Sequence, residues 1–330
     1  MNDLPISQAP ASDPSPDRAA VRLLEAAGAE LGVAVQTFCS GWLIHLRHPD
    51  GRTRLVWGYN FDLNPSAGAH AAKDKAAAFE LLRFAGVPAV EHRLFLRADL
   101  AGHVSEAGSW RGLLAALEAF GNDAVIKPVD GSGGAGVSRV RTPRELEQAA
   151  QGLWERGHAI CLCPHVQIVR EVRHILLDGE PRIVYAKEID ALIGDGRSTL
   201  GELLAARALG RPADWSRLAA SAARQHGERA WNEVPHAGER LSLGWKHNLR
   251  GANVMMLDPP DPTLLDLAQR AAQTLGLRLC AVDVVETGRG EALVLEVNAG
   301  LMLERFVAQA SGGWERSVAL CRDILTRMFA

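Results

Sequence analysis

The sequence has few aromatic residues and few cysteines, and it lacks a long apolar run or a large excess of one charge. Aromatic residues make up 5% of the 330 residues, there are five cysteines, and the formal net charge is −3. Such a charge gives no electrostatic basis for nucleic-acid binding. No apolar run approaches the ~18–20 residues that a membrane-spanning helix needs. We therefore expect neither nucleic acid nor a membrane as a partner.

The start of the chain lacks the basic and apolar segments of a signal peptide. It is rich in Pro, Ser and Asp, which predicts a disordered tail over residues 1–18. Without export we expect a cytoplasmic location and reduced cysteines. Cys161 and Cys163 are spaced C-x-C in an apolar stretch with no matching Cys or His pair. This favours buried strand residues over a zinc site.

The remaining composition is ordinary for a globular protein, with 47% hydrophobic and 23% charged residues. The length suffices for two or three packed units. Short strand-like runs alternate with helix-like stretches along the chain. The clearest predicted helix covers residues 71–85, because it is Ala-rich and is followed by Gly86 and Pro88.

One glycine-rich stretch, AVIKPVDGSGGAGVSRV at residues 124–140, contains G-x-G-x-x-G at Gly131, Gly133 and Gly136. Both flanks are strand-like, and the next helix is predicted only from Thr142, which forms a capping box with Glu145. A dinucleotide-binding fingerprint needs the glycines to open a helix, and a Walker loop needs Gly-Lys-Ser/Thr. The stretch is therefore either a flexible hairpin lid over phosphates or a simple turn. The number of glycines favours the lid, because glycine often marks a close approach of the backbone to a ligand.

Lys127 precedes these glycines inside an apolar strand. A buried ammonium needs an anion. The alternative is a lysine that extends from the strand end to solvent. A buried, charged Lys127 would support a phosphate site.

Two acidic residues lie on the last predicted strands, AVDVVETGRGEALVLEVNAG. Pairing about the TGRG turn places Asp283 opposite Glu296, and alternation puts Asn298 on the same face as Glu296. Like charges opposed on a sheet are destabilising unless a cation neutralises them, and oxygen ligands suit Mg²⁺ or Mn²⁺. A surface sheet face with two solvated acids is the alternative. A phosphate lid together with a metal site indicates a nucleoside triphosphate, with Mg²⁺ bridging its phosphates.

These motifs, in this order, resemble the ATP-grasp superfamily, in the group of cyanophycin synthetase, glutathione synthetase and ribosomal-protein glutamate ligase. The similarity runs from about residue 30 to about residue 305. It also includes the stretches IGDGRSTLGELL and VPHAGERLSLGWKHNLRGA. The resemblance implies an α+β ATP-grasp fold, in which two α+β lobes clamp ATP, with a reduced N-terminal α/β domain. The implied units are an N-terminal domain (19–85), a small lid subdomain (86–165) and a C-terminal subdomain with the Mg²⁺ site (166–330).

The resemblance also assigns site residues. For ATP it implies Lys75, Lys127, Ser132, Gly133, Gly134, Gly136, Cys163, His165, Val166 and Glu171. For metal it implies Asp283, Glu296 and Asn298. We expect Arg250, Lys246 and Asn248 to stabilise the transferring phosphoryl group, and Arg250 and Arg173 to bind substrate. Two departures from the family are a Cys163-Pro164-His165 hinge in place of Gln-Glu, and the lack of the extra domains of cyanophycin synthetase, which speaks against polymer synthesis.

The implied activity is ATP-dependent joining of a carboxylate to an amine through an acyl phosphate, with release of ADP and phosphate. Amino acids or small peptides are the expected substrates, and a homodimer or homotetramer is expected by family. The alternatives are a ligase that modifies a protein or peptide terminus, a non-catalytic nucleotide-binding module, a kinase-like phosphotransferase and an NAD-dependent dehydrogenase.

Overall fold

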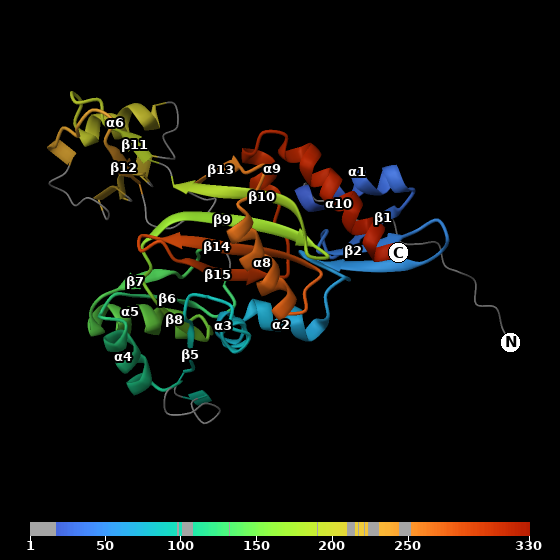
Figure 1. Cartoon of the computed structure of the whole chain (residues 1–330), viewed down its shortest axis with the longest axis horizontal. Coiled ribbons are helices and arrows are strands. Elements are labelled where there is room, and N and C mark those ends of the chain that lie inside the picture. Colours follow the sequence, from blue (N-terminus) through green and yellow to red (C-terminus); the bar gives the residue numbers. More distant parts are fainter. Residues whose placement is uncertain are drawn as a thin grey trace.

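The computed structural model describes residues 18–97, 99–100, 108–131, 133–189, 191–209, 215–216, 218–220, 222–223, 231–243 and 252–330. Helices and antiparallel sheets are mixed along the chain (Figure 1), which confirms the predicted α+β class. The predicted tail lies outside the described residues up to residue 17. Within the described part of the chain, no helix has both the length and the apolarity to cross a bilayer.

The N-terminal segment forms helix α1 (Ala19–Leu31) and a four-stranded antiparallel sheet. The strands follow chain order: β1 (Ala34–Phe38), β2 (Leu43–Arg47), β3 (Thr53–Trp57) and β4 (Asn60–Phe61). Helix α1 packs against the last helix, α10 (Gly313–Phe329), so the two ends of the described chain share one core (Figure 1).

The predicted helix over residues 71–85 is two helices in the structure. Helix α2 (Ser66–Lys73) ends at Asp74, and α3 (Lys75–Phe84) begins directly after it. Asp74 adopts an extended conformation and its carboxylate accepts hydrogen bonds from the backbone of Ala76 and Ala77, at 2.9 and 3.0 Å. The prediction of one continuous helix was wrong because this N-cap competes with helix continuation.

The second sheet is four-stranded, in the order β5 (Arg93–Phe95), β8 (Ile160–Pro164), β6 (Ala124–Pro128), β7 (Ser138–Val140). Helices α4 (Trp110–Ala119) and α5 (Pro143–Trp154) cover one face and bury the side chains of Ile126, Leu113 and Leu146. The capping box predicted at Thr142 is present. The other face of this sheet carries Val125 and Lys127 toward the cavity described below.

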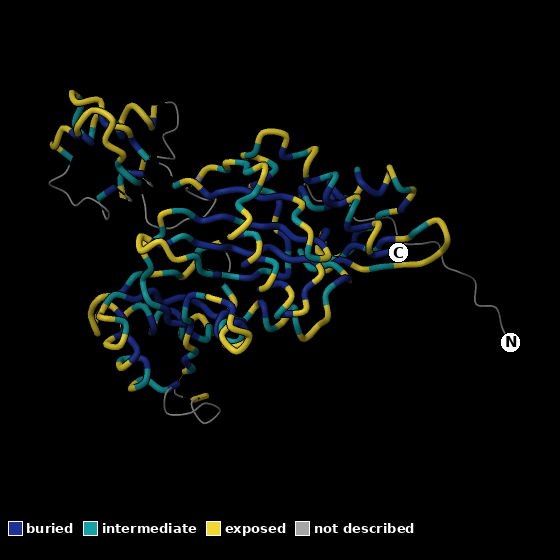
Figure 2. The backbone as a smooth tube through the Cα atoms, viewed as in Figure 1, coloured by how far each residue is buried: buried dark blue, intermediate teal, exposed yellow. Residues whose placement is uncertain are grey.

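The third sheet is five-stranded and antiparallel, and its interior is buried (Figure 2). Its order is β13 (Ala252–Met256), β10 (Glu180–Ile189), β9 (Ile168–Leu177), β14 (Leu279–Thr287), β15 (Ala292–Asn298). Helix α8 (Pro262–Thr274) covers one face, with α2 and α3 beside it. Helices α9 (Glu304–Gln309), α10 and α1 lie on the opposite face.

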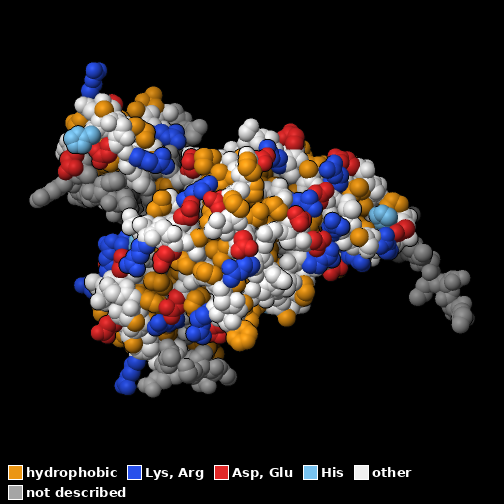
Figure 3. All heavy atoms as spheres, in the orientation of Figure 1, with side chains coloured by type: hydrophobic (Ala, Val, Ile, Leu, Met, Phe, Trp, Pro, Cys, Tyr) orange, Lys and Arg blue, Asp and Glu red, His pale blue; other side chains and the backbone are white. Residues whose placement is uncertain are grey.

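A small unit projects from the rest of the molecule (Figure 1). It contains strands β11 (Ala191–Ile193) and β12 (Arg240–Ser242) and helix α6 (Leu200–Ala208). The predicted capping box of Thr199 with Glu202 is present at the start of α6. Over the face shown in Figure 3, basic and acidic side chains are interspersed, as the small net charge suggests.

Candidate active site

A cavity of about 620 Å³ lies between the second sheet, which contains β6 and β8, and the five-stranded sheet. We call its two sides the small-sheet wall, formed by β6, β8 and the glycine loop, and the large-sheet wall, formed by β9, β10, β14 and β15. Its volume falls in the range of ligand sites, roughly 300–1,000 Å³. Among the described residues, five basic side chains and four acidic ones line it: Lys75, Lys127, Arg173, Lys187, Arg305, Glu171, Asp283, Glu296 and Glu304.

Lys127 belongs to the small-sheet wall. All five residues of β6 are buried, and alternation turns Lys127 away from the helices and into the cavity. Burial disfavours its ammonium, but the nearby thiols of Cys163 and Cys161 and the carboxylate of Glu296 raise its pKa. A charged lysine therefore stands in an apolar setting, where it would bind an anion strongly.

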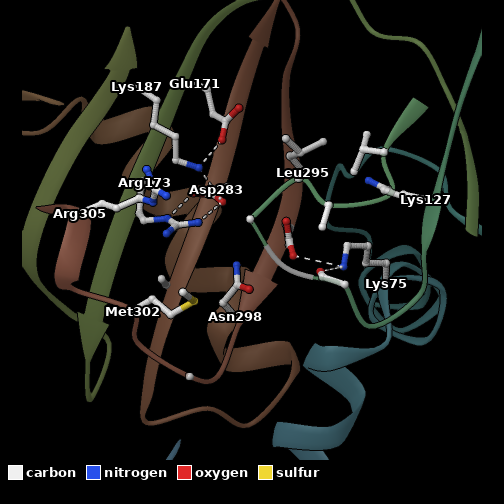
Figure 4. A pocket seen from close by; sticks show the side chains of 18 of the residues that line it. Lys75, Lys127, Glu171, Arg173, Lys187, Asp283, Leu295, Asn298, Met302 and Arg305 are labelled. Carbon is white, nitrogen blue, oxygen red and sulfur yellow. Dashed lines mark hydrogen bonds and ion pairs between the residues drawn. The ribbon is translucent and has the colours of Figure 1, made fainter. Parts of the chain in front are cut away.

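Lys75 is the first residue of α3 and joins three parts of the site. Its Nζ donates to the backbone oxygens of Val129 at 3.2 Å and Gly131 at 2.8 Å, and it lies 3.3 Å from Oε1 of Glu296 (Figure 4). The break at Asp74 directs this side chain, because it starts a new helix at this point. Lys75 thus connects the glycine loop to the large-sheet wall.

The glycine loop joins β6 to β7, as the sequence predicted. Gly133, Gly134 and Gly136 have φ of 65°, 75° and 69°, a region that favours glycine. Gly133 and Gly134 line the cavity. Backbone N–H groups in such a loop can surround a phosphate. Ser132 lies outside the described residues.

An apolar slot lies next to the lysines, between the two sheets. Val125, Cys163, Val166 and Leu295 contribute to its walls. Cys163, His165 and Val166 line the cavity where β8 leads into β9, at the hinge that the resemblance implies. A slot of this kind suits the flat, largely apolar face of a nucleobase.

The large-sheet wall carries a network of buried charges. Arg173 holds Asp283 with two hydrogen bonds, from Nε at 2.8 Å and from Nη2 at 2.6 Å (Figure 4). Lys187 lies 2.9 Å from Oδ2 of Asp283 and also pairs with Glu171. Each of the two carboxylates is thereby matched by at least one cation.

These contacts shift the pKa values of the acids in opposite directions. Burial opposes ionisation of Asp283, but Arg173 and Lys187 outweigh it and hold its pKa well below the usual value. Burial dominates at Glu171 and raises its pKa to about 7, although Lys187 acts against this. Asp283 is therefore the permanently charged centre of the network.

Sequence and structure comparisons add independent information. No protein-family model matches the chain. It is 28% identical over 264 residues to cyanophycin synthetase of Trichormus variabilis, covering 74% of this chain and 28% of that protein. It is 41% identical over 75 residues to the ribosomal protein bS6–L-glutamate ligase of Salmonella paratyphi B, covering 22% of this chain and 25% of that protein.

The structure of a bifunctional glutathione synthetase from Pasteurella multocida matches with a TM-score of 0.55 and 16% identity, covering 93% of this chain and 44% of that one. The chain has the ATP-grasp fold. The expected resemblance to ATP-grasp ligases is also confirmed. The chain spans less than a third of the length of these two curated relatives.

The three predicted metal ligands all line the cavity. Asp283 and Glu296 are direct partners in the β14–β15 register, and Asn298 lies two residues further on β15. Among the described residues no three His, Cys, Asp or Glu side chains are grouped to hold a metal, so the set depends on the Asn298 amide. The amide nitrogen of Asn298, a hydrogen-bond donor that cannot bind the metal itself, is buried and has no hydrogen-bond partner among the described residues.

Mg²⁺ fits this donor set only in part. Oxygen donors from Glu296 and Asn298 suit the ion. Both oxygens of Asp283 are already held by Arg173 and Lys187, so a metal there would have to displace one of them. Glu296 would likewise exchange its contact with Lys75.

Other predicted residues are divided between the cavity and the segments without a described structure. Arg173 and Glu171 line the cavity, but Arg173 is paired with Asp283. Lys246, Asn248 and Arg250 lie outside the described residues.

Sequence reasoning missed Lys187. It lies in β10 and is 6% exposed, between Glu171 and Asp283. The signal was present, since RIVYAKEI places a lysine inside an apolar run just as AVIKPV does. The pairing with Asp283 could not be inferred, because it depends on β10 and β14 both flanking β9.

Proposed function

We propose that the protein is an ATP-dependent carboxylate–amine ligase that forms an amide or peptide bond through an acyl phosphate. The observation that carries the proposal is the grouping of three buried lysines, Lys75, Lys127 and Lys187, with carboxylates around one cavity beneath a glycine loop. The fold and the relatives named as synthetase and ligase support it.

ATP would bind across both walls. The apolar slot would hold the adenine, with backbone groups of residues 161–166 beside it. Lys75 and Lys127 would hold the phosphates as point charges, and the glycine loop would cover the γ-phosphate. Glu296, Asn298 and, after exchange, Asp283 would hold Mg²⁺ or Mn²⁺, which when bound neutralises charge on the phosphate oxygens.

The chemistry follows from the weakness of a carboxylate as an electrophile. Transfer of the γ-phosphoryl group to the acid gives an acyl phosphate with a good leaving group. A neutral amine then attacks the carbonyl carbon, and phosphate leaves from the tetrahedral intermediate. Lys187 would stabilise the negative charge that develops in both steps, because cations act strongly where water is excluded.

We propose amino acids or small peptides as the substrates. The cytoplasmic location and the homodimeric or homotetrameric state remain predictions. A ligase acting on a protein or peptide terminus is the second candidate.

The test is ADP formation by the purified chain with Mg²⁺, ATP and pools of amino acids and peptides, followed by mass spectrometry of the products. The proposal expects ADP release that depends on both an acid and an amine, and hydroxylamine should intercept the acyl phosphate. ATP binding without turnover under all pools would instead support a non-catalytic nucleotide-binding module.

A further inference from the structure

A buried histidine lies where the two walls of the cavity meet. His92 directly precedes β5 and is 4% exposed. The segment in front of it is tied to β15, because the backbone N–H of Val90 donates to the carbonyl oxygen of Val294, and the N–H of Val294 donates to that of Pro88, both at 2.9 Å. Since Glu296 is two residues further along β15, the histidine and this carboxylate belong to one hydrogen-bonded frame.

The ring of His92 is oriented by one hydrogen bond. Its Nδ1 lies 2.7 Å from the carbonyl oxygen of Val90, and because a carbonyl oxygen only accepts, Nδ1 carries the hydrogen. Burial and the positive charges of Lys127 and Lys75 hold its pKa well below the usual value, so the ring is neutral. The other nitrogen, Nε2, is therefore an acceptor, and it is buried without a hydrogen-bond partner among the described residues.

A small cavity lies beside this histidine. Its volume is about 10 Å³, close to the lower limit of roughly 10–15 Å³ for a space that holds one water molecule. Among the described residues, three polar side chains line it, those of Lys75, His92 and Glu296, and the other lining side chains are apolar. A buried water needs several polar partners, and these three provide two acceptors and one donor.

We infer that His92 is a positioning residue, which orients Glu296 and Lys75 through one water molecule bound in this small cavity. This inference rests on the proposed function, in which the two side chains hold the metal and the phosphates. The water would donate its two hydrogens to Nε2 of His92 and to Glu296, and would accept one from Lys75. A neutral acceptor suits this place, because a further carboxylate would draw the lysine away from the phosphates.

The link gains importance when the ligands bind. The Nζ of Lys75 lies 3.3 Å from Oε1 of Glu296, and a bound metal would exchange this contact. The water would keep one oxygen of the carboxylate in place while the other binds the metal. Loss of such an outer partner of a metal ligand typically lowers metal affinity by about 10–100-fold.

The first test measures binding of a non-hydrolysable ATP analogue in the presence of Mg²⁺ by calorimetry, together with thermal unfolding of each free variant. His92→Leu should bind the analogue about 10-fold more weakly or worse, because the water loses its acceptor. His92→Gln should regain most of the affinity, since its side-chain oxygen can accept from the water. If the histidine only filled space, affinity would instead follow the thermal stability of the variants.

The matched control is His70→Leu, at an exposed histidine of α2 that lines neither cavity, and it should bind the analogue like the wild type.

The second test needs no nucleotide. Nitrogen NMR of protein with ¹⁵N-labelled histidine, assigned with the help of His92→Gln, reports which ring nitrogen carries the hydrogen and whether the other accepts a hydrogen bond. We expect the hydrogen on Nδ1 and a hydrogen-bonded Nε2. The Nε2 resonance should shift in Glu296→Gln, because the water then loses its charged partner.

The inference is overturned if Nε2 carries the hydrogen or accepts no hydrogen bond, or if its resonance is the same in Glu296→Gln. It is also overturned if His92→Leu binds the analogue as tightly as the wild type, or if a stable His92→Gln binds it as weakly as His92→Leu. A failure of the proposed function looks different, since the wild type would then bind no analogue, or would form no ADP with any acid and amine, whatever the NMR result.

Discussion

The two walls of the cavity carry charge in different ways. On the small-sheet wall, Lys127 stands among Val125, Cys161 and Cys163, with a glycine loop beside it. On the large-sheet wall, every charge of the Asp283 network is matched by a partner from a neighbouring strand. The first wall is thus ready to receive an anion, whereas the second is balanced and can receive a ligand only by exchanging partners.

The difference predicts that substitutions in the Asp283 network affect stability, whereas substitutions of Lys127 and Glu296 affect nucleotide and metal binding. The first three predictions below test this division in order of decreasing effect, and the fourth concerns the reverse side of the large-sheet wall.

Asp283→Asn should strongly destabilise the protein. The substitution leaves Arg173 and Lys187 without their buried counter-charge, and breaking a buried pair in this way costs about 3–5 kcal/mol. Chemical denaturation followed by circular dichroism measures this loss. The matched variant is Glu296→Gln, whose side chain is half-buried and which should lose less than about 1 kcal/mol. Equal stability of the two variants would contradict the claim that the buried ion pairs of Asp283 stabilise the large-sheet wall.

Lys127→Ala should lower kcat/KM for ATP by about 100-fold or more, since the phosphates lose a charge in a site of low polarity. Steady-state ADP release measures the effect, and thermal unfolding should show an intact fold. Lys73→Ala, at an exposed lysine of α2, is the control and should retain wild-type activity. A Lys127 variant with normal activity would contradict the role of the small-sheet wall.

Glu296→Gln should raise the Mg²⁺ concentration needed for half-maximal activity by about 10-fold or more, because a charged oxygen ligand is lost. A Mg²⁺ titration of ADP release at saturating ATP measures the shift. An unchanged titration would mean that the metal does not use this residue.

The reverse side of the large-sheet wall contains a buried histidine. His174 is fully buried under α8, and burial lowers its pKa to about 4. Because the unfolded histidine has a pKa near 6.5, the unfolded state binds more protons between pH 4 and 6.5. Stability should therefore rise with pH across this window.

His174→Leu should remove about 1–2 kcal/mol of the stability difference between pH 5 and pH 7.5. Denaturation at the two pH values measures it, and a loss of absolute stability by the variant does not affect the comparison. His236→Gln, at an exposed histidine, should keep the wild-type pH dependence. If His174→Leu also keeps it, the histidine is not the titrating group.

The parts of the fold that could be predicted from sequence are those set by local chemistry. The tight turn at residues 287–290 sets the β14–β15 register as far as Val284 and Val294, and an irregularity between Asp283 and Val284 then brings Asp283 opposite Glu296. The capping boxes at Thr142 and Thr199 depend on residues three apart. Lys127 was identifiable because a charge inside an apolar strand needs an anion. The resemblance supplied the order of the motifs and the ATP-grasp fold.

What could not be predicted depends on contacts between distant segments. The pairing of Asp283 with Arg173 and Lys187 requires three strands side by side, and no spacing in the sequence indicates it. The break at Asp74 was missed for the opposite reason, because the alanines around it favour helix so strongly that they hid a local N-cap.

The central claim is that a triphosphate binds between the two walls and replaces ion pairs of the large-sheet wall with metal contacts. A crystal structure with Mn²⁺ and a non-hydrolysable ATP analogue tests it most directly, because Mn²⁺ gives an anomalous signal. We expect Mn²⁺ beside Glu296 and Asn298, with the phosphates next to Lys75 and Lys127. A nucleotide bound elsewhere, with the Lys75–Glu296 contact intact and no metal at β15, would contradict the claim.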